Sequence, residues 1–276
     1  GGSSNHFYRL DVSVSPRVLF SQPSVIQRGK TTRVTLFGWN LGTSDEAVTQ
    51  ASGSSEPGQA AVPKLTPDLA GYTQRVIEIT PPLQPLRSGS YRQPAAVAVA
   101  GFLHHVPGAD TPIWISLTDV PVALDQGGNQ AAESAQLLQV PGQVSGQLAV
   151  GNERDWYRIT ARRGEVFHIE GFAERIGSTA DLDISVMDHT GKKELAHYRD
   201  ELLNIGGLRF PSSHLDPAGR WVAPADGDYL IVVRNLIGGL QADSRRTYRL
   251  SVRREESEVR LVAIAHQPTS PAAINV

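Results

Sequence analysis

The segment Asp226-Gly227-Asp228-Tyr229-Leu230-Ile231-Val232-Val233 decides the fold class of this chain. It opens with an Asp-Gly pair, which is a strong turn signal, and continues as an unbroken run of aromatic and branched apolar residues. This combination is typical of a buried β-strand that follows a tight turn.

Similar short runs lie on both sides of that segment. Residues 247–252 are also dense in apolar side chains, whereas residues 32–38, 155–160 and 181–186 alternate between polar and apolar. The 26 glycines and 18 prolines make turns frequent between them. Many short strands separated by turns predict an all-β chain made of β-sandwiches. No long amphipathic helix is evident, and residues 130–139 could form only a short one.

The length of 276 residues predicts two domains, at about 150 residues each. Residues 125–130 contain a Gly-Gly pair among small polar residues, which is typical of a linker. The predicted organisation is a preceding strand with a short cloning remnant at 1–14, an Ig-like β-sandwich at 15–120, a linker at 121–130, a jelly-roll-like β-sandwich at 131–255, and the start of a following segment at 256–276.

One internal repeat suggests that these domains belong to a tandem array. Residues 7–12, Phe-Tyr-Arg-Leu-Asp-Val, resemble residues 247–252, Thr-Tyr-Arg-Leu-Ser-Val. If the second copy is the last strand of its domain, the first copy is expected to close an earlier domain of the same kind.

Composition excludes several classes of protein. A net charge of −2 gives no basic excess for nucleic acid, and no run approaches the roughly 18 apolar residues of a membrane span. The lack of cysteine excludes disulfides, thiolate metal sites and a cysteine nucleophile. No signal peptide is visible.

No catalytic motif stands out. The eight histidines include no His-Glu-x-x-His pattern, and no Gly-x-Ser-x-Gly sequence is present. Asp181 and Asp183 share one face of a predicted strand and could serve a glycosidase, but no second catalytic element accompanies them. The chain is therefore expected not to be an enzyme, and a hydrolase fragment is kept as an alternative.

The second domain carries an ordered set of short motifs. The motifs are Pro141-Gly142-Gln143-Val144-Ser145-Gly146-Gln147-Leu148, Gly151-Asn152-Glu153-Arg154-Asp155-Trp156-Tyr157-Arg158-Ile159, Ala173-Glu174-Arg175-Ile176-Gly177-Ser178 with Leu182-Asp183, the opening segment at 226–233, and Tyr248-Arg249-Leu250. In this order they resemble the bacterial pre-peptidase C-terminal (PPC) domain, a β-sandwich appended to secreted peptidases, in a version associated with planctomycete proteins. The resemblance covers residues 129–254. More loosely, Pro23, Gly29 and residues 34–42 are similar to the immunoglobulin-like IPT/TIG class.

This resemblance implies a calcium site, because several PPC domains bind calcium through a carboxylate-rich linker and nearby strand ends. The candidate ligands are Asp125, Asn129, Asp155 and Asp183. The linker lacks the family's paired glutamates, and Asn152 replaces an aspartate, so the site would carry less negative charge. The alternative is that these aspartates start strands and cap turns.

Trp221 is the best candidate for a ligand-binding aromatic residue, because it follows a Pro/Gly-rich stretch that is typical of an exposed turn. The function that the sequence favours is a non-catalytic extracellular accessory module of a larger secreted bacterial protein, at the cell surface or in the periplasm. A carbohydrate- or protein-binding domain with a specific ligand is the alternative. The expected partners are neighbouring domains of the same polypeptide, and a polysaccharide or an extracellular protein.

Overall fold

The computed structural model describes residues 12, 14–42, 72–81, 99–204, 213–237 and 241–255. Within these ranges the chain forms strands, turns and two short 3-10 helices, η3 (Ala132–Ser134) and η4 (Glu174–Ile176), and it contains no α-helix. The all-β prediction is confirmed. No helix in these ranges has the length and hydropathy needed to cross a membrane.

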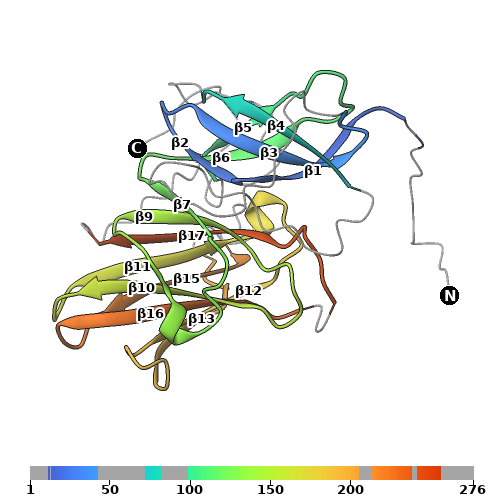
Figure 1. Ribbon diagram of the computed structural model, residues 1–276. Coiled ribbons are helices and arrows are strands. Elements are labelled where there is room, and N and C mark those ends of the chain that lie inside the picture. Colours follow the sequence, from blue (N-terminus) through green and yellow to red (C-terminus); the bar gives the residue numbers. More distant parts are fainter. Residues whose placement is uncertain are drawn as a thin grey trace, which may run out of the picture.

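The N-terminal half forms two three-stranded sheets (Figure 1). One has the antiparallel order β1-β3-β4; the other has the order β2-β6-β5, with β2 parallel to β6. Val34, Leu36 and Ile115 are fully buried between them and belong to one apolar core. The strands are β1 (Arg17–Gln22), β2 (Val25–Gln27), β3 (Thr32–Trp39), β4 (Thr73–Ile79), β5 (Gly101–His104) and β6 (Ile113–Thr118).

The C-terminal half forms a larger sandwich with its own core. A five-stranded sheet has the order β13-β12-β16-β10-β8, and a six-stranded sheet has the order β14-β15-β11-β17-β9-β7. The strands are β7 (Val122–Leu124), β8 (Gln136–Leu137), β9 (Gly142–Gln147), β10 (Arg154–Ala161), β11 (Val166–Phe172), β12 (Leu182–Met187), β13 (Glu194–Tyr198), β14 (Asp200–Glu201), β15 (His214–Val222), β16 (Gly227–Asn235) and β17 (Thr247–Arg254).

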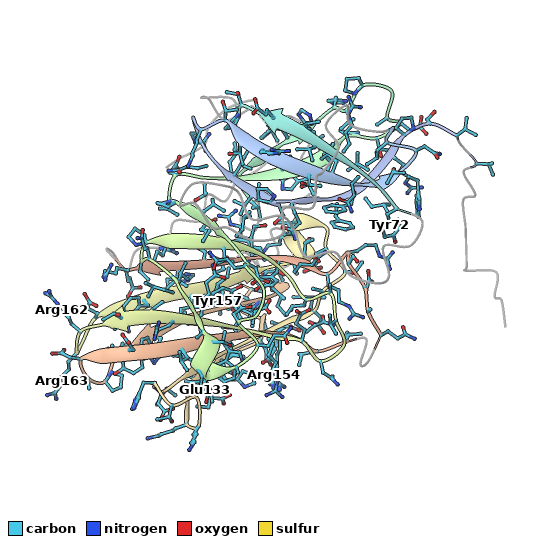
Figure 2. The ribbon with its side chains drawn as sticks, in the orientation of Figure 1. Tyr72, Glu133, Arg154, Tyr157, Arg162 and Arg163 are labelled. Atoms are coloured by element: carbon cyan, nitrogen blue, oxygen red, sulfur yellow. The ribbon has the colours of Figure 1, made fainter. Side chains whose placement is uncertain are left out.

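The sequence pattern explains the burial of the central strands. In β10, Asp155, Tyr157 and Ile159 are buried while Arg154 and Arg158 are exposed, as period-two alternation requires. Figure 2 shows Tyr157 inside this sandwich, whereas Arg162 and Arg163 project from the far end of β10 into solvent. The opening segment, residues 226–233, supplies most of β16, which lies between β10 and β12.

The segment expected to be a linker, residues 121–130, contains a strand. β7 pairs in parallel with β9, and the backbone N–H of Asp125 donates to the carbonyl of Ser145 at 3.0 Å. This segment therefore forms the edge of the six-stranded sheet. The expected earlier strand at residues 7–11 and the following segment at 256–276 lie outside the described residues.

A buried hydrogen-bond network joins the two halves where the turn after β1 meets β9. Ser145 Oγ accepts from the backbone N–H of Ser24 at 2.9 Å and donates to Gln22 Oε1 at 3.1 Å. Gln22 Nε2 donates to the carbonyl of Gly146 at 3.3 Å. This contact ties the first sandwich to the outer face of the six-stranded sheet (Figure 1).

Candidate functional site

Three of the four predicted calcium ligands lie near one another in the second sandwich. Asp125 directly follows β7, Asn129 lies in the turn after it, and Asp155 faces the core from β10. The backbone N–H of Trp156 donates to the carbonyl of Asn129 at 2.8 Å, which holds the turn against β10. Asp125 and Asp155 both act electrostatically on Tyr157 and Tyr248.

Asp155 is part of a buried chain of hydrogen bonds. Tyr248 Oη donates to Asp155 Oδ2 at 2.6 Å, so the hydroxyl of Tyr157, 2.5 Å away, donates to Tyr248 Oη. Burial and the negative charge of Asp155 raise the pKa of both tyrosines well above 10. Both phenols therefore stay protonated: Tyr157 donates to Tyr248, and Tyr248 donates to the buried carboxylate of Asp155, which is a structural role.

A glycine gives Tyr248 the room to reach Asp155. Gly146 lies opposite Tyr248 in the β9–β17 pair, and a Cβ on Gly146 would lie 2.2 Å from Tyr248 Cζ. This close approach explains why the motif at 144–148 carries glycine at this position.

We expect Gly146→Ala to destabilise the second sandwich by about 1–3 kcal/mol, because the added methyl group would displace a fully buried ring. Chemical denaturation checks this expectation. In a Tyr248→Ala background the same substitution should cost much less, since the ring it displaces is gone. Equal costs in both backgrounds would contradict the steric explanation.

Asp183 lies apart from the other three predicted ligands. Asp155 and Ile184 both pair with Val233, so these residues share one face of the sheet, and Asp183, next to Ile184, points to the opposite face. There its carboxylate, fully buried, forms ion pairs with Arg234 (2.7 Å) and Arg199 (3.1 Å) and a hydrogen bond with His197 Nε2 (2.6 Å). The two arginines neutralise the charge of Asp183, which explains how this carboxylate can be buried on the outer face of the sheet.

The hydrogen bonds to Asp183 also affect its ionisation. Burial raises the pKa of this carboxyl, but the hydrogen bonds with Arg234 and His197 lower it by more. The pKa of Asp183 therefore lies below its usual value of 3.8. The pKa of Asp181, two residues away, is shifted in the opposite direction, because burial and the charges of Asp200 and Asp183 raise it.

These opposite shifts predict opposite pH effects. A carboxyl with a lowered folded-state pKa stabilises the fold above pH 3.8, and this stabilisation is lost as the pH falls through the folded-state value. We therefore expect Asp183→Asn to reduce the loss of stability in acid. Asp181→Asn is the matched control and should instead increase stability near neutral pH. Urea unfolding across this pH range measures both, and equal responses would contradict the assignment.

The donor set around Asp155 does not fit a calcium site. Calcium takes six to eight oxygens, several from carboxylates, whereas Asp125, Asn129 and Asp155 offer two carboxylates and one amide oxygen. Asp125 Oδ1 already accepts from the backbone N–H of Gly127 at 3.1 Å, and Asp155 Oδ2 accepts from Tyr248. In the described ranges, no three His, Asp or Glu side chains are grouped to hold a metal ion.

The resemblance predicts a calcium site, whereas the donor set is too small for one, and the melting temperature decides between them. A ligand that binds only the folded state raises this temperature. Because the donor set is incomplete, we expect the same melting temperature in calcium and in EDTA. A calcium-dependent rise that Asp125→Asn abolishes would show that these residues do hold the ion.

Trp221 is not exposed, so that expectation is wrong. Its side chain is 5% exposed and packs in the core, with its ring centroid 4.7 Å from that of Tyr229 and 5.7 Å from that of Phe167. The stretch before it does not end in an exposed turn but continues β15. Trp221 therefore offers no ring face to a ligand.

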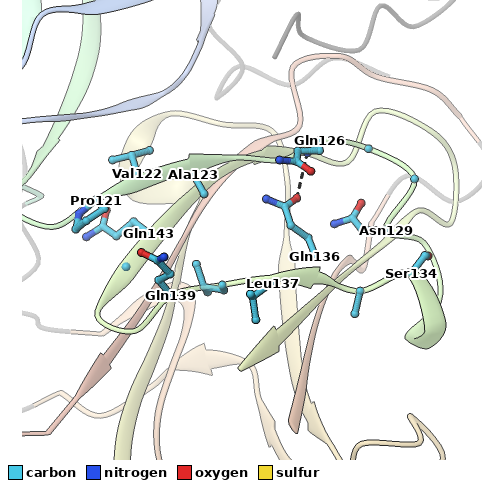
Figure 3. Close-up of a pocket in the computed structure, with 15 residues that line it drawn as sticks. Pro121, Val122, Ala123, Gln126, Asn129, Ser134, Gln136, Leu137, Gln139 and Gln143 are labelled. Carbon is cyan, nitrogen blue, oxygen red and sulfur yellow. Dashed lines mark hydrogen bonds between the residues drawn. The ribbon is translucent and has the colours of Figure 1, made fainter. Parts of the chain in front are cut away.

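The site that sequence reasoning missed is a cavity of about 580 Å³ at the edge of the second sandwich. It lies between β7 and β8, the last strands of their respective sheets, and extends to the start of β9 (Figure 3). Its polar side chains are amides and one hydroxyl: Gln126, Asn129, Ser134, Gln136, Gln139 and Gln143. The repeated glutamines between residues 126 and 143 are the signal that could have indicated it.

Comparison with known proteins gives structural likenesses at low identity. No family model and no curated protein matches the chain. It is similar to PliG, a periplasmic inhibitor of g-type lysozyme, from Aeromonas hydrophila (19% identity, TM-score 0.28, covering 49% of this chain and 95% of that one) and from Salmonella Typhimurium (16%, 0.27, 44% and 98%). It is also similar to the pre-peptidase C-terminal domain of a collagenase from Bacillus anthracis, with 17% identity and a TM-score of 0.32 over 43% of this chain and 93% of that domain.

Proposed function

We propose that this chain is a non-catalytic accessory module of a larger exported bacterial protein, and that it acts by binding. The observation that carries the proposal is the composition of the cavity between β7 and β8. None of the fifteen residues that line it has an ionisable side chain. Proton transfer in catalysis needs a group that ionises near the working pH, so this cavity is suited to recognition.

The buried carboxylates elsewhere in the second sandwich support the same proposal. Asp155 accepts from Tyr248, Asp183 pairs with two arginines and a histidine, and Asp216 accepts from the backbone and side chain of Arg175. Each carboxylate accepts hydrogen bonds from groups that also fix a strand or a turn. Their shared role is to hold the sandwich together.

The contact between the two halves supports a module that connects other domains. Ser145, Ser24 and Gln22 are buried and hydrogen-bonded to one another, so the first sandwich is held on the second. Neighbouring domains of the same polypeptide are the proposed partners, together with a ligand in the cavity. The PPC resemblance of residues 129–254 supports a parent protein that acts outside the cytoplasm.

A turnover assay tests the non-catalytic proposal. The purified chain is incubated with peptide and glycan substrates, and we expect no product. Asp155→Asn and Asp183→Asn should lower the stability of the fold and change no activity. Turnover by the wild-type chain that either substitution abolishes without unfolding it would overturn the proposal.

A further inference from the structure

A row of arginines crosses the outer face of the five-stranded sheet near one end of its strands. Arg154 on β10 lies opposite Arg234 on β16, and Arg234 lies opposite Asp183 on β12. Arg199 directly follows β13 and forms an ion pair with Asp183 from the other side, at 3.1 Å. The row therefore crosses the sheet in the order Arg154, Arg234, Asp183, Arg199. Because neighbouring strands lie about 4.8 Å apart, the row spans about 14 Å.

Asp183 holds two of these arginines by one nitrogen atom each. Arg234 donates from Nε to Oδ1 at 2.7 Å, and Arg199 donates from Nε to Oδ2 at 3.1 Å. Among the described residues, no group accepts from the Nη atoms of either arginine. Their side chains are 34% and 62% exposed, so a ligand can reach these atoms. A guanidinium that is held at Nε presents its two Nη groups as a preorganised pair of donors.

The row carries more positive charge than the fold requires. One arginine neutralises one carboxylate, but two arginines are paired with Asp183. Arg154 is exposed and forms no ion pair in the part of the chain that the structure describes. Its position opposite Arg234 brings two like charges together, which destabilises a sheet. Stability therefore does not explain the row, whereas the binding of an anion does.

Other acidic side chains near the row are not paired with its arginines. Glu153 accepts from Gln130 Nε2 at 3.2 Å, and Glu194 accepts from Ser185 Oγ at 2.8 Å. Asp181 precedes β12 and forms no ion pair within the described ranges. The Nη groups of the row are therefore left for an anion from outside the chain.

The ligand that fits the row is a polymer with several carboxylates. A carboxylate accepts two N–H groups of one guanidinium in a bidentate pair. Because the row spans about 14 Å, it can engage more than one carboxylate of the same molecule, which raises the overall affinity. The row crosses β16 and β12, which pair with strands on both sides, so their backbone groups are occupied within the sheet. An added peptide strand therefore has no free edge here.

We infer that this row binds an acidic polysaccharide, whose carboxylates pair with Arg154, Arg234 and Arg199. A uronic acid carries its carboxylate directly on the sugar ring, whereas a glutamate carries it at the end of a flexible side chain. The glycan therefore loses less conformational entropy when it binds. None of these arginines lines the cavity between β7 and β8, so the row is a second site, beyond the proposed function.

The test is calorimetric titration of the whole chain at low ionic strength with a hexamer of galacturonic acid. Maltohexaose is the neutral glycan for comparison, and a blocked hexaglutamate is the acidic peptide. The decisive variants are Arg154→Gln and Arg199→Gln, each of which removes one exposed guanidinium. Arg163→Gln is the matched control, because Arg163 is also exposed and lies past the opposite end of β10 (Figure 2).

We expect the galacturonic acid hexamer to bind, and each decisive variant to weaken this binding roughly tenfold. Arg163→Gln should bind as the wild type does, and added salt should weaken binding because it screens exposed charges. The melting temperature of Arg154→Gln should equal or exceed that of the wild type, since a pair of like charges is removed. Weaker binding by this variant would then not result from unfolding.

Three results would overturn the inference: no binding of the galacturonic acid hexamer, equal weakening by Arg163→Gln and the two decisive variants, or tighter binding of maltohexaose or hexaglutamate than of the acidic glycan. These failures leave the proposed function intact, because neither the cavity nor the absence of catalysis depends on the row.

Discussion

Replacing Trp221 by alanine is expected to lower the free energy of unfolding of the second sandwich by about 3–5 kcal/mol. The side chain is 5% exposed and packs against Phe167 and Tyr229, so its loss removes a large buried apolar surface and two aromatic contacts. The cavity left behind adds to the cost, because the rigid strands around it cannot collapse fully.

Urea denaturation followed by near-UV circular dichroism measures this effect. Val222→Ala is the matched control, since Val222 follows Trp221 on β15, faces the opposite side and is 43% exposed. Its cost should be about 1 kcal/mol or less. Equal effects of the two substitutions would mean that Trp221 does not pack in the core.

Asp216→Ala is expected to have a comparable effect, about 3–5 kcal/mol. The carboxylate of Asp216 is fully buried and accepts four hydrogen bonds. Oδ1 accepts from the backbone N–H groups of Ala173 (2.7 Å) and Glu174 (2.8 Å), and Oδ2 accepts from the backbone (3.2 Å) and Nε (2.7 Å) of Arg175. These bonds hold the turn at η4 against β15.

The cost arises mainly from what the substitution leaves behind. Arg175 is 9% exposed and would keep its ion pair with Glu170 at 2.9 Å, but three backbone N–H groups would lose their acceptor. In an Arg175→Met background, Asp216→Ala should cost less, because no buried charge is left partly paired.

Asp188→Ala is the control for Asp216→Ala. Asp188 also accepts backbone N–H groups, those of Lys192 and Lys193, but it does so in an exposed turn. We expect a much smaller cost than at Asp216, since water replaces the lost bonds. Equal costs at the two aspartates would contradict the view that burial makes Asp216 important.

The sequence was most informative where the structural signal is local. Alternation and apolar runs predicted the positions of β3, β10, β12, β16 and β17, because neighbouring residues on a strand point to opposite faces. The three-residue β7 carries no such signal, and its place beside β9 depends on pairing with a distant segment. For the same reason, the sequence indicated a linker there.

Trp221 shows how a turn signal can mislead. Pro217 and Gly219 suggested an exposed turn, but both lie within β15. Gly219 is needed for packing, since a Cβ there would lie 1.9 Å from Cε1 of Tyr198. A sequence pattern does not distinguish a glycine that makes room for a ring from one that makes a turn.

The candidate site was predictable only in part. Period-two alternation puts neighbouring residues on opposite faces, but it does not tell which face of a strand is buried or what lies across from it. Asp155 and Asp183 therefore looked equivalent, although Asp155 faces Tyr248 in the core and Asp183 faces Arg234 on the outside. The cavity is lined by residues of β7, β8 and β9. These strands come close together only through the complete topology of the two sheets, which the sequence pattern does not give.

The central claim is that this chain binds through its edge cavity and does no chemistry there. A titration of the ¹⁵N-labelled chain with cellotriose, maltotriose, triacetylchitotriose and a neutral tetrapeptide, followed by ¹⁵N–¹H correlation spectra and by the ligand signals themselves, tests it most directly. We expect shifts concentrated in residues 121–143, with the ligand signals unchanged in number over time. Shifts elsewhere, no shifts with any of these ligands, or new ligand signals from a cleaved product would contradict it.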